Sequence, residues 1–327
     1  MREFHGSEVV GQAPDQGALA GVRHGRTAPS PRAPHAPADR PAARLSQALL
    51  TPLRVRALRD GLSILGLIAL VWTVLFAHPD DVRTYWSFHL AAPYGSHIGG
   101  ANAFLYSPVA ALVALPFHAL PFEAVRLLLV AADVACLVFL AGPWALAVLA
   151  LPPVFADVAA GNIHILLGTA IALGFRYPGT WAFVLLTKVT PGVGLLWFLV
   201  RREWRNLGLA LGVTAGLALA SALVVPGWWP AWMAALDAST HAVVTAPVLT
   251  TAPLVWRIAV SAALVAWGAW TGRRWTVPLA AMLALPAVWV MGTSILLGAL
   301  PSLRAYQSTT GLGEPATVPR APVPGVG

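Results

Sequence analysis

Residues 61–77 read GLSILGLIALVWTVLFA, an apolar run that follows Arg54, Arg56 and Arg59. A helix needs about 20 mainly apolar residues to cross the hydrocarbon core of a bilayer, and basic residues beside a span favour the cytoplasmic side. We therefore predict that this run is the first membrane span. It places the N-terminus in the cytoplasm and residues 78–101 on the extracytoplasmic side.

The composition of the chain is that of a membrane protein. Its 327 residues are 57% hydrophobic and 10% charged, against about 45 to 50% and about 25% in soluble domains. The formal net charge is +8, but the basic residues lie in the N-terminal segment and beside apolar runs rather than on one amphipathic face. We therefore expect membrane lipids as partners and no nucleic acid.

Further apolar runs follow the first at short intervals. They cover residues 103–120, 125–141, 143–158, 163–175, 180–200, 205–225, 254–271 and 275–300. With nine spans, the basic clusters at Arg201 and Arg273 lie inside and residues 226–253 lie outside, as the positive-inside rule requires. Prolines and glycines interrupt residues 143–175, so eight or ten spans also fit. The predicted fold is an all-α, polytopic transmembrane helix bundle of about nine spans.

Two segments with little to bury flank the predicted bundle at residues 56–300. Residues 1–55 are basic and rich in proline and alanine, which predicts a disordered cytoplasmic tail. Residues 301–327 are rich in proline and glycine, which predicts a flexible C-terminal tail. Three tryptophans between residues 228 and 232 follow a span and are typical of interfacial anchors, so short interfacial helices are expected in the outer loops.

The loop after the first span holds the densest group of polar residues in the predicted bundle. It reads HPDDVRTYWSFHLAAPYG over residues 78–95, with polar side chains at Asp80, Asp81, Arg83, Tyr85, His89 and Tyr94. Such a loop is either a solvated surface or part of an active site. In the second case, a carboxylate would act as a general base towards a hydroxyl.

Polar residues also interrupt the apolar runs that follow. Tyr106 precedes a Ser-Pro step, a pattern that is equally typical of an interfacial anchor and a helix start. Asp157, Asn162 and His164 lie in an otherwise apolar region. Ionisable groups at membrane depth are costly and usually face the bundle interior or a cavity, so these three residues are candidates for a functional site.

The only lysine of the chain, Lys188, lies inside the apolar segment WAFVLLTKVTPGVGLLWFLVRREWR, residues 181–205. The Pro-Gly step after Thr190 predicts a kinked helix, with Lys188 and Thr190 directed into the gap. A lysine there suits an anionic group such as a phosphate. The alternative is an ion pair with Asp157 or Asp133 that neutralises both charges.

The sequence indicates no metal site. Cys136 is the only cysteine, which excludes an internal disulfide and a cysteine metal cluster. No group of carboxylates and histidines has the spacing of metal ligands. We therefore expect neither a metal nor another cofactor.

Four motifs together resemble glycosyltransferase family 87: DVRTYW, FLYSPV, GNIHILL and AFVLLTKVTPGVGLLWFLVRREWR. The resemblance covers residues 60–300 approximately, and the lysine-centred block is its most specific part. Members of this family are actinobacterial membrane enzymes of the GT-C type. They include polyprenol-phosphate-mannose-dependent mannosyltransferases that build phosphatidylinositol mannosides and related glycans. A histidine that some members carry late in the chain has no counterpart in residues 284–301.

The resemblance implies a GT-C-like fold and a hexosyltransferase of the plasma membrane. Such an enzyme transfers a sugar, here expected to be mannose, from a polyprenyl-phosphate donor to a hydroxyl of a glycolipid or glycan acceptor in the cell envelope. The lipid-linked sugar is then a co-substrate, and the active site is extracytoplasmic. The usual base of the family is an aspartate in the first outer loop, a position that matches Asp81, with Asp80 as its neighbour.

The leaving phosphate of such a reaction needs cations. Lys188, Arg83 and Arg257 are the candidates to neutralise it. The residues expected to bind substrate are Asp80, Arg83, Tyr85, Tyr106, Asp157, Asn162, His164, Lys188 and Thr190.

Other functions fit the same residues. A transporter or lipid flippase would use Asp133, Asp157 and Lys188 as an intramembrane ion-pair relay. A structural scaffold explains the hydrophobicity but not the lysine, and an inactive homologue of the family is a further alternative. A transferase requires its essential acid in the outer loop, whereas a transporter requires it near the bilayer midplane, so the place of that acid separates the two.

Overall fold

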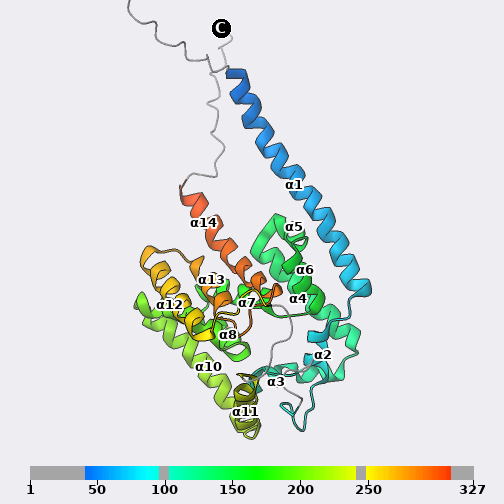
Figure 1. Cartoon of the computed structure of the whole chain (residues 1–327), viewed down its shortest axis with the longest axis vertical. Coiled ribbons are helices and arrows are strands. Elements are labelled where there is room, and N and C mark those ends of the chain that lie inside the picture. The colour runs from blue at the N-terminus through cyan, green and yellow to red at the C-terminus, as the bar shows by residue number, and fades with distance from the viewer. Residues whose placement is uncertain (1–40, 96–102, 241–247, 311–327) are drawn as a thin grey trace, which may run out of the picture. The chain divides into compact units, whose positions relative to one another are not determined.

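A computed structural model describes residues 41–95, 103–240 and 248–310, and every secondary-structure element in these ranges is a helix (Figure 1). The all-α prediction is thereby confirmed. The α-helices are α1 (Pro41–Phe76), α2 (Asp80–Ser87), α3 (Pro108–Ala114), α4 (Phe122–Ala141), α5 (Ala145–Leu149), α6 (Pro152–Ala160), α7 (His164–Gly174), α8 (Trp181–Thr187), α9 (Leu196–Val200), α10 (Trp204–Val224), α11 (Trp228–Thr240), α12 (Leu254–Thr271), α13 (Thr276–Leu283) and α14 (Leu300–Thr310). The 3-10 helices are η1 (Leu115–Ala119), η2 (Gly142–Trp144), η3 (Pro178–Thr180), η4 (Thr190–Leu195) and η5 (Met291–Ala299).

Helix α1 begins earlier than the predicted span. The chain divides into two units, residues 1–50 and 51–327, and in the first unit the structure describes the helical backbone of residues 41–50. Residues 41–55 had been assigned to the disordered tail, and residues 1–40 lie outside the described residues. Alanine, leucine, arginine and glutamine predominate in the added turns, and these residues are strong helix formers. Extending an existing helix also costs far less than starting one.

The C-terminal end of the described chain is helical as well. Residues 301–310, assigned from composition to the flexible tail, form most of α14, and residues 311–327 lie outside the described residues. Helix α14 packs on α4 and η5, and Arg304 donates a hydrogen bond to the carbonyl of Leu140. These contacts stabilise the helix, and local composition carries no sign of them.

Four helical segments are long and apolar enough to cross a membrane: Thr51–Phe76, Phe122–Leu149, Trp204–Val224 and Leu254–Thr271. Helices α6 and α7 together form a fifth candidate, bent by 106° at the break between them. This agrees with the interruption expected in that part of the sequence. Within the described residues the count is therefore four or five, and the predicted count of about nine spans is not confirmed.

The other predicted spans fold as shorter helices that pack on the rest of the bundle. Residues 103–120 form α3 and η1, residues 180–200 form α8, η4 and α9, and residues 275–300 form α13 and η5. Each of these runs contains proline, which interrupts helical hydrogen bonding. Helix α13 contacts α7, η4 and η5. Part of the apolar surface of these segments is covered by other protein segments, and a hydropathy count does not register this difference.

Helix α7 is fixed in the bundle by a close contact with η5. A Cβ atom on Gly298 would lie 2.5 Å from the carbonyl oxygen of Gly168, and a Cβ atom on Gly168 would lie 2.9 Å from the carbonyl oxygen of Ile295. Small residues permit such approaches between membrane helices. The contact holds in place the helix whose first turn carries His164.

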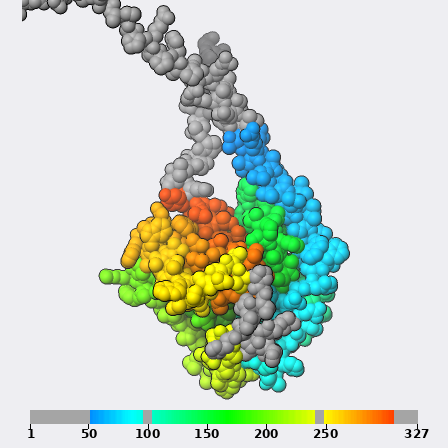
Figure 2. Space-filling model, viewed as in Figure 1, coloured from blue at the N-terminus to red at the C-terminus, as the bar shows by residue number. Residues whose placement is uncertain are grey.

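The outward faces of α1 and α10 are apolar. Leu223 exposes 78% of its surface, Leu219 exposes 63% and Ile64 exposes 62%. Figure 2 shows the second-unit part of α1, in blue, as a continuous surface on the side of the molecule. Exposed large apolar side chains along a whole helix face are expected where lipid rather than water surrounds the helix.

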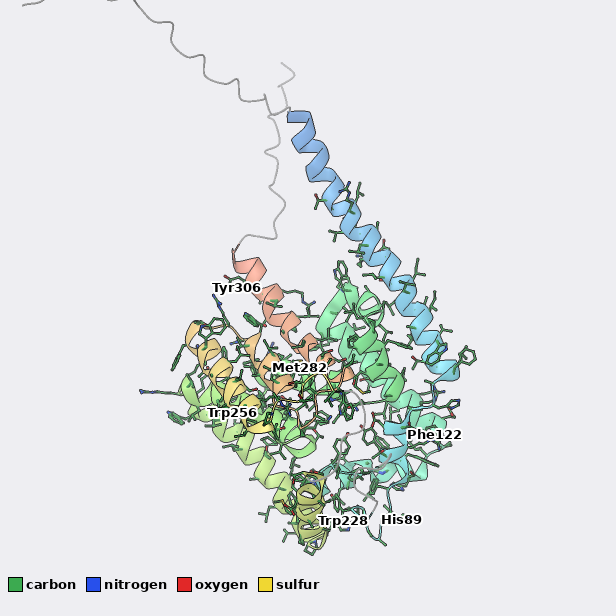
Figure 3. All side chains as sticks on the ribbon, in the orientation of Figure 1. His89, Phe122, Trp228, Trp256, Met282 and Tyr306 are labelled. Carbon is green, nitrogen blue, oxygen red and sulfur yellow. The ribbon has the colours of Figure 1, made fainter. Side chains whose placement is uncertain are left out.

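Helices α2, α3 and α11 gather at one end of the second unit (Figure 1), where α3 contacts both of the others. His89 and Trp228 lie at this end (Figure 3). Helices α2 and α11 are short and occupy the two loops for which such helices were predicted. Their place at a membrane interface remains a prediction.

Candidate active site

The break between α6 and α7 brings several polar residues together. Helix α6 ends at Ala160, and Gly161 has a φ of 69°, in the left-handed region that glycine adopts without strain. After it, the side-chain oxygen of Asn162 accepts a hydrogen bond of 2.7 Å from the backbone N–H of Ile163. A Cβ atom on Gly161 would overlap the side chain of Val82. Glycine therefore also allows α2 to pack directly on the break.

Asp81 lies in the first turn of α2 and faces this break. Asn162 Nδ2 donates a hydrogen bond of 2.8 Å to Asp81 Oδ2. Burial raises the pKa of Asp81 above its ordinary value of 3.8, and the hydrogen bond from Asn162 and the charge of Lys188 oppose this increase only in part. The carboxylate is thus a stronger base than an exposed aspartate, yet it is only partly buried. That combination suits a general base.

The two other charged residues of α2 have different surroundings. The side chain of Asp80 is exposed. Arg83 is also exposed, and its guanidinium carbon lies 4.9 Å from the centre of the Phe122 ring at the start of α4. Of the charged residues predicted in this loop, Asp81 is the one that the structure joins to the α6–α7 break.

Two tyrosine hydroxyls lie close enough to Asp81 for its charge to affect their pKa. The hydroxyl oxygens of Tyr85 and Tyr106 are 3.0 Å apart. Burial raises the pKa of both hydroxyls, and the negative charge of Asp81 raises it further. Both hydroxyls are therefore neutral. One donates its proton to the other, so one hydroxyl proton of the pair remains to bind a substrate oxygen.

The segment that carries Tyr106 is held by hydrogen bonds from two other aromatic residues. The hydroxyl of Tyr94 donates to the carbonyl of Tyr106 at 2.9 Å, and Trp232 Nε1 donates to the carbonyl of Leu105 at 3.0 Å. Ser107 then caps α3, because its side-chain oxygen accepts a hydrogen bond from the third residue that follows. The position of Tyr106 is thus fixed by the segment that follows α2 and by α11.

Lys188 occupies a gap between two helices. Helix α8 ends at Thr187, and Lys188 has extended backbone angles (φ −140°, ψ 105°) before η4 begins at Thr190. Pro191 disfavours a continuous helix here because it lacks a backbone donor and restricts the residue before it. The predicted kink is present, and Lys188 lies in it. Its Nζ atom is 2.9 Å from His164 Nε2.

His164 connects Lys188 to a buried carboxylate. His164 Nδ1 is 2.8 Å from Asp157 Oδ1, and Asp157 Oδ2 accepts a hydrogen bond of 3.1 Å from the backbone N–H of Ile165. The side chains of both Asp157 and His164 are 0% exposed. Among the described residues, Lys188 forms no ion pair with either Asp157 or Asp133. The alternative of a direct ion pair is therefore not found, and Lys188 is connected to Asp157 through the histidine ring.

Two buried polar atoms in this part of the bundle have no hydrogen-bond partner among the described residues. One is Thr190 Oγ1, two positions after Lys188, and the other is Asp133 Oδ1 on α4. A buried group without a partner is uncommon, because its desolvation is not compensated. The hydroxyl of Thr190 is therefore available for a ligand at the gap that holds Lys188.

Arg257 is occupied away from this site. Its guanidinium donates hydrogen bonds to the carbonyls of Ala252, Leu283, Leu285 and Pro286. These bonds attach α12 to the segment after α13, which is a structural role. Of the three cations predicted to neutralise a phosphate, Lys188 is the one whose charge acts on Asp81.

An apolar cavity of about 440 Å³ opens beside the tyrosine pair. Its polar lining side chains are those of Tyr85, Tyr106, Thr180 and Thr187. The other lining residues are Phe104, Val109, Ala110, Val113, Ala114, Phe117, Leu129, Ile163, Leu166, Gly179, Ala182, Phe183, Leu186, Val213 and Leu217. The cavity therefore suits an amphipathic ligand, with its apolar chain in the cavity and its polar end at the tyrosine pair.

The groups gathered here define what the site is able to do. Asp81 can accept a proton, Lys188 can neutralise an anion, and the tyrosines and Thr190 can bind oxygen atoms. In the part of the chain that the structure describes, no group of three or more His, Cys, Asp or Glu residues is arranged to hold a metal ion. The arrangement fits group transfer with an anionic leaving group.

The model of glycosyltransferase family 87 matches residues 104–312. The chain belongs to this family. Comparisons with curated proteins and with solved structures found no match. Membership in family 87 identifies a membrane glycosyltransferase, in agreement with the resemblance seen in the sequence. The motifs FLYSPV, GNIHILL and the lysine-centred block lie within the match, and DVRTYW precedes it.

The family 87 match includes Tyr106, Asn162, His164 and Lys188, but it begins after α2. The matched region therefore does not contain Asp81. What connects Asp81 to the matched region is its hydrogen bond to Asn162.

Sequence reasoning did not find two features that position the site. One is the double requirement for glycine at Gly161, for which the signal is a Gly-Asn step directly after a short helical segment. The other is the hydrogen bond from Trp232 to the carbonyl of Leu105. No local pattern connects residues that far apart in the chain.

Proposed function

We propose that this family 87 protein transfers a hexose, mannose, from a polyprenyl-phosphate donor to a hydroxyl group of a glycolipid or glycan acceptor. The reaction takes place on the extracytoplasmic side of the plasma membrane, with Asp81 as general base. The observation that carries the proposal is that Asp81 and Lys188 both contact the segment 162–164, whose middle residue, Ile163, lines the apolar cavity. Asn162 binds Asp81, and His164, two residues later, contacts Lys188.

The reaction is a direct displacement at the anomeric carbon. The acceptor oxygen attacks this carbon while its proton passes to a carboxylate oxygen of Asp81. The bond between the anomeric carbon and the phosphate oxygen breaks, its electron pair stays on that oxygen, and polyprenyl phosphate leaves. One carboxylate is sufficient for such a transfer, which inverts the anomeric configuration.

Lys188 stabilises the charge that develops on the leaving phosphate. An ammonium group in a water-poor site interacts more strongly with an anion than it does in water. The unpaired hydroxyl of Thr190 and the free proton of the tyrosine pair supply neutral donors to the same group.

The apolar cavity supports a lipid-linked donor over a nucleotide sugar. Its lining is almost entirely apolar, so the ribose and base of a nucleotide would lose their hydrogen bonds with water and gain few in return. An isoprenoid chain has no such groups to satisfy. Each of its methylene groups gains about 0.8 kcal/mol on burial.

The order of charges along the chain supports an extracytoplasmic site. Arg54, Arg56 and Arg59 precede the apolar part of α1, and α2 follows its other end after three residues. If the basic end lies in the cytoplasm, Asp81 lies across the membrane from it. Donors linked to a lipid phosphate are suited to that side because they do not depend on cytoplasmic nucleotides.

The proposal is tested with purified protein in lipid vesicles, radiolabelled polyprenyl-phosphate-mannose and a panel of glycolipid acceptors. We expect wild-type protein to form mannosylated product. We expect Asp81→Asn to lower the rate by at least about 100-fold, because general-base catalysis contributes about 10²- to 10⁴-fold.

The control variant is Asp237→Asn, which removes an exposed carboxylate on α11 and is expected to retain the wild-type rate. Full transfer by Asp81→Asn would contradict the role of this residue. Loss of transfer in Asp80→Asn with retention in Asp81→Asn would assign the base to the neighbouring acid.

A further inference from the structure

Asp157 and His164 are the most deeply buried ionisable pair at the site. Both side chains are 0% exposed, so neither is placed to touch a donor or an acceptor. Polar groups at this depth are costly unless they are paired. Their contact with each other and with Lys188 therefore requires a functional explanation other than direct substrate binding.

With Asp157 as a carboxylate and Lys188 as an ammonium group, the hydrogen bonds along this chain of groups run in one direction. The carboxylate of Asp157 is an acceptor, so His164 Nδ1 carries the proton and donates it. His164 Nε2 then has a free lone pair, and the ammonium of Lys188, which has no acceptor, donates to it at 2.9 Å. The backbone N–H of Ile165 holds the second oxygen of Asp157, which fixes the carboxylate at the start of the chain.

The hydrogen bond from Lys188 to His164 restricts the position of the Lys188 ammonium group. Lysine has a flexible stem and three equivalent donors, and the residue itself lies in an extended gap between α8 and η4. One N–H is held by His164, and the other two have no partner among the described residues. The ammonium is therefore held at one point, and two of its donors remain for a ligand. The hydroxyl of Thr190, two residues further along the chain, also has no partner among the described residues.

We infer that Asp157 and His164 are positioning residues that hold the Lys188 ammonium against the phosphate of the donor, with His164 fixed in its Nδ1–H form. The inference rests on the proposed function, in which Lys188 binds the leaving phosphate. It replaces the expectation that Asp157 and His164 bind substrate themselves. It also separates them from Asp81, which acts on the acceptor.

The first experiment determines the proton position on His164 and needs no substrate. ¹⁵N NMR of histidine-labelled protein distinguishes Nδ1–H from Nε2–H, and the spectrum of His164→Gln assigns the His164 signals among the nine histidines of the chain. We expect Nδ1–H in the wild-type protein. We expect Nε2–H in Asp157→Asn, because the amide that replaces the carboxylate donates to Nδ1. An Nε2–H ring in the wild-type protein would overturn the inference.

The second experiment is a double-variant cycle with radiolabelled polyprenyl-phosphate-mannose. Asp157→Asn turns a ring N–H towards the ammonium of Lys188, and we expect kcat/KM for the donor to fall about 10- to 100-fold because the ammonium is displaced. In a Lys188→Met background the same change is expected to have no further effect. Independent, additive losses in the double variant would show a merely structural role and sink the inference.

Matched variants separate positioning from general damage to the bundle. Asp133→Asn makes the same chemical change at another buried carboxylate. Among the described residues, Asp133 forms no hydrogen bond with Lys188, His164 or Asp157 and acts on Asp157 only through its charge. We expect it to retain kcat/KM within about twofold. His164→Gln places an amide near the former Nε2 position and is expected to restore more activity than His164→Asn, whose amide lies near Nδ1. Equal loss in the two histidine variants would contradict the inference.

The two experiments also distinguish this inference from the proposed function. If wild-type protein transfers no sugar from the lipid-linked donor, the proposed function fails, and the tautomer of His164 still decides whether the hydrogen-bond chain exists. If transfer occurs and His164 is in the Nε2–H form, the function stands and the positioning role is wrong.

Discussion

Asp80 and Asp81 are adjacent residues of one short helix, and they have opposite surroundings. Successive side chains of an α-helix point about 100° apart, so only one of the two can face the bundle. The contact between Val82 and Gly161 determines which one does, and it turns Asp81 towards Asn162. The identity of the base is thus a result of packing, because the two acids are equivalent in the local sequence.

The hydrogen bond from Asn162 controls the pH at which Asp81 becomes a base. Activity requires the carboxylate form, so the rate rises with pH through the pKa of Asp81. Burial raises that pKa and the Asn162 hydrogen bond lowers it. In Asn162→Ala the lowering effect is lost, and we expect the acid limb of the kcat/KM profile to move to higher pH, because the ionised carboxylate loses a hydrogen bond that stabilises it.

Thr84→Val is the matched control for this pH shift. Thr84 lies on the same helix, is buried, and donates its hydroxyl to the backbone carbonyl of Asp80 rather than to the Asp81 carboxylate. We expect its acid limb to coincide with that of wild-type protein. An acid limb in Asn162→Ala that stays in place or moves to lower pH would contradict the assignment of Asp81 as the titrating base.

At the scale of elements, the α6–α7 break requires glycine for two separate reasons. Gly161 has a left-handed backbone conformation, and its missing Cβ gives room to Val82 on α2. A side chain in that conformation costs roughly 1 to 2 kcal/mol. We therefore expect Gly161→Ala to lower thermal stability in detergent and also to lower the transfer rate, because α2 and Asp81 are pushed away from Asn162.

A second glycine with a left-handed backbone separates the effect of backbone strain from the effect of the contact with Val82. Gly272 has a φ of 72°, and a Cβ atom there would meet nothing within 4 Å. Gly272→Ala is expected to share the loss of stability but to keep the transfer rate. If the two variants lose activity equally, the contact of α2 with the break does not position Asp81. Recovery of activity in Gly161→Ala with Val82→Ala would support it further.

Helices α3, α7, α8 and α10 contribute to the wall of the cavity beside the tyrosine pair. If the lipid chain of the donor binds there, filling the cavity should weaken donor binding. Ala110 on α3 lines it, and tryptophan at this position would fill part of the space. Excluding two methylene groups costs about 1.6 kcal/mol, which corresponds to a rise in KM of about tenfold. We expect Ala110→Trp to raise the KM of a long-chain polyprenyl-phosphate-mannose by this factor.

A donor with two isoprene units is the internal comparison for Ala110→Trp, because a short chain loses less contact with the cavity. Ala124→Trp is the control variant: Ala124 is exposed on α4 and does not line the cavity. It is expected to leave both KM values unchanged. An unaltered KM for the long-chain donor in Ala110→Trp would mean that the lipid chain binds elsewhere.

How far the sequence predicts this site depends on the kind of interaction. Asp157, His164 and Lys188 were identified as polar residues in apolar surroundings, because such residues need partners wherever they lie. The sequence did not predict that histidine would stand between the two charges. That order depends on the bend of 106° between α6 and α7 and on the gap at Lys188. Both breaks were expected from glycine and proline, but their angles were not.

At the scale of the whole molecule, hydrophobicity predicted the class of fold, whereas its count of about nine spans is not confirmed within the described residues. The outward faces of α1 and α10 are apolar because lipid is their expected surroundings, whereas η5 and α13 are apolar because other helices cover them. Ile295 on η5 and Val277 on α13 are both 0% exposed. A hydropathy count cannot distinguish these two causes. The arginine pattern contains independent information on orientation, and its prediction is open to a direct test.

The proposed extracytoplasmic site predicts which residues are accessible from outside the cell. Cys136 is the only cysteine, so Cys136→Ala provides a background in which single cysteines can be labelled with a membrane-impermeant maleimide. His89 and Arg205 are both exposed, and the positive-inside rule assigns them to opposite sides. We expect His89→Cys to react in intact cells and Arg205→Cys to react only after the cells are permeabilised. The reverse pattern would place Asp81 in the cytoplasm, where nucleotide sugars are the expected donors, and would contradict the lipid-linked donor together with the orientation.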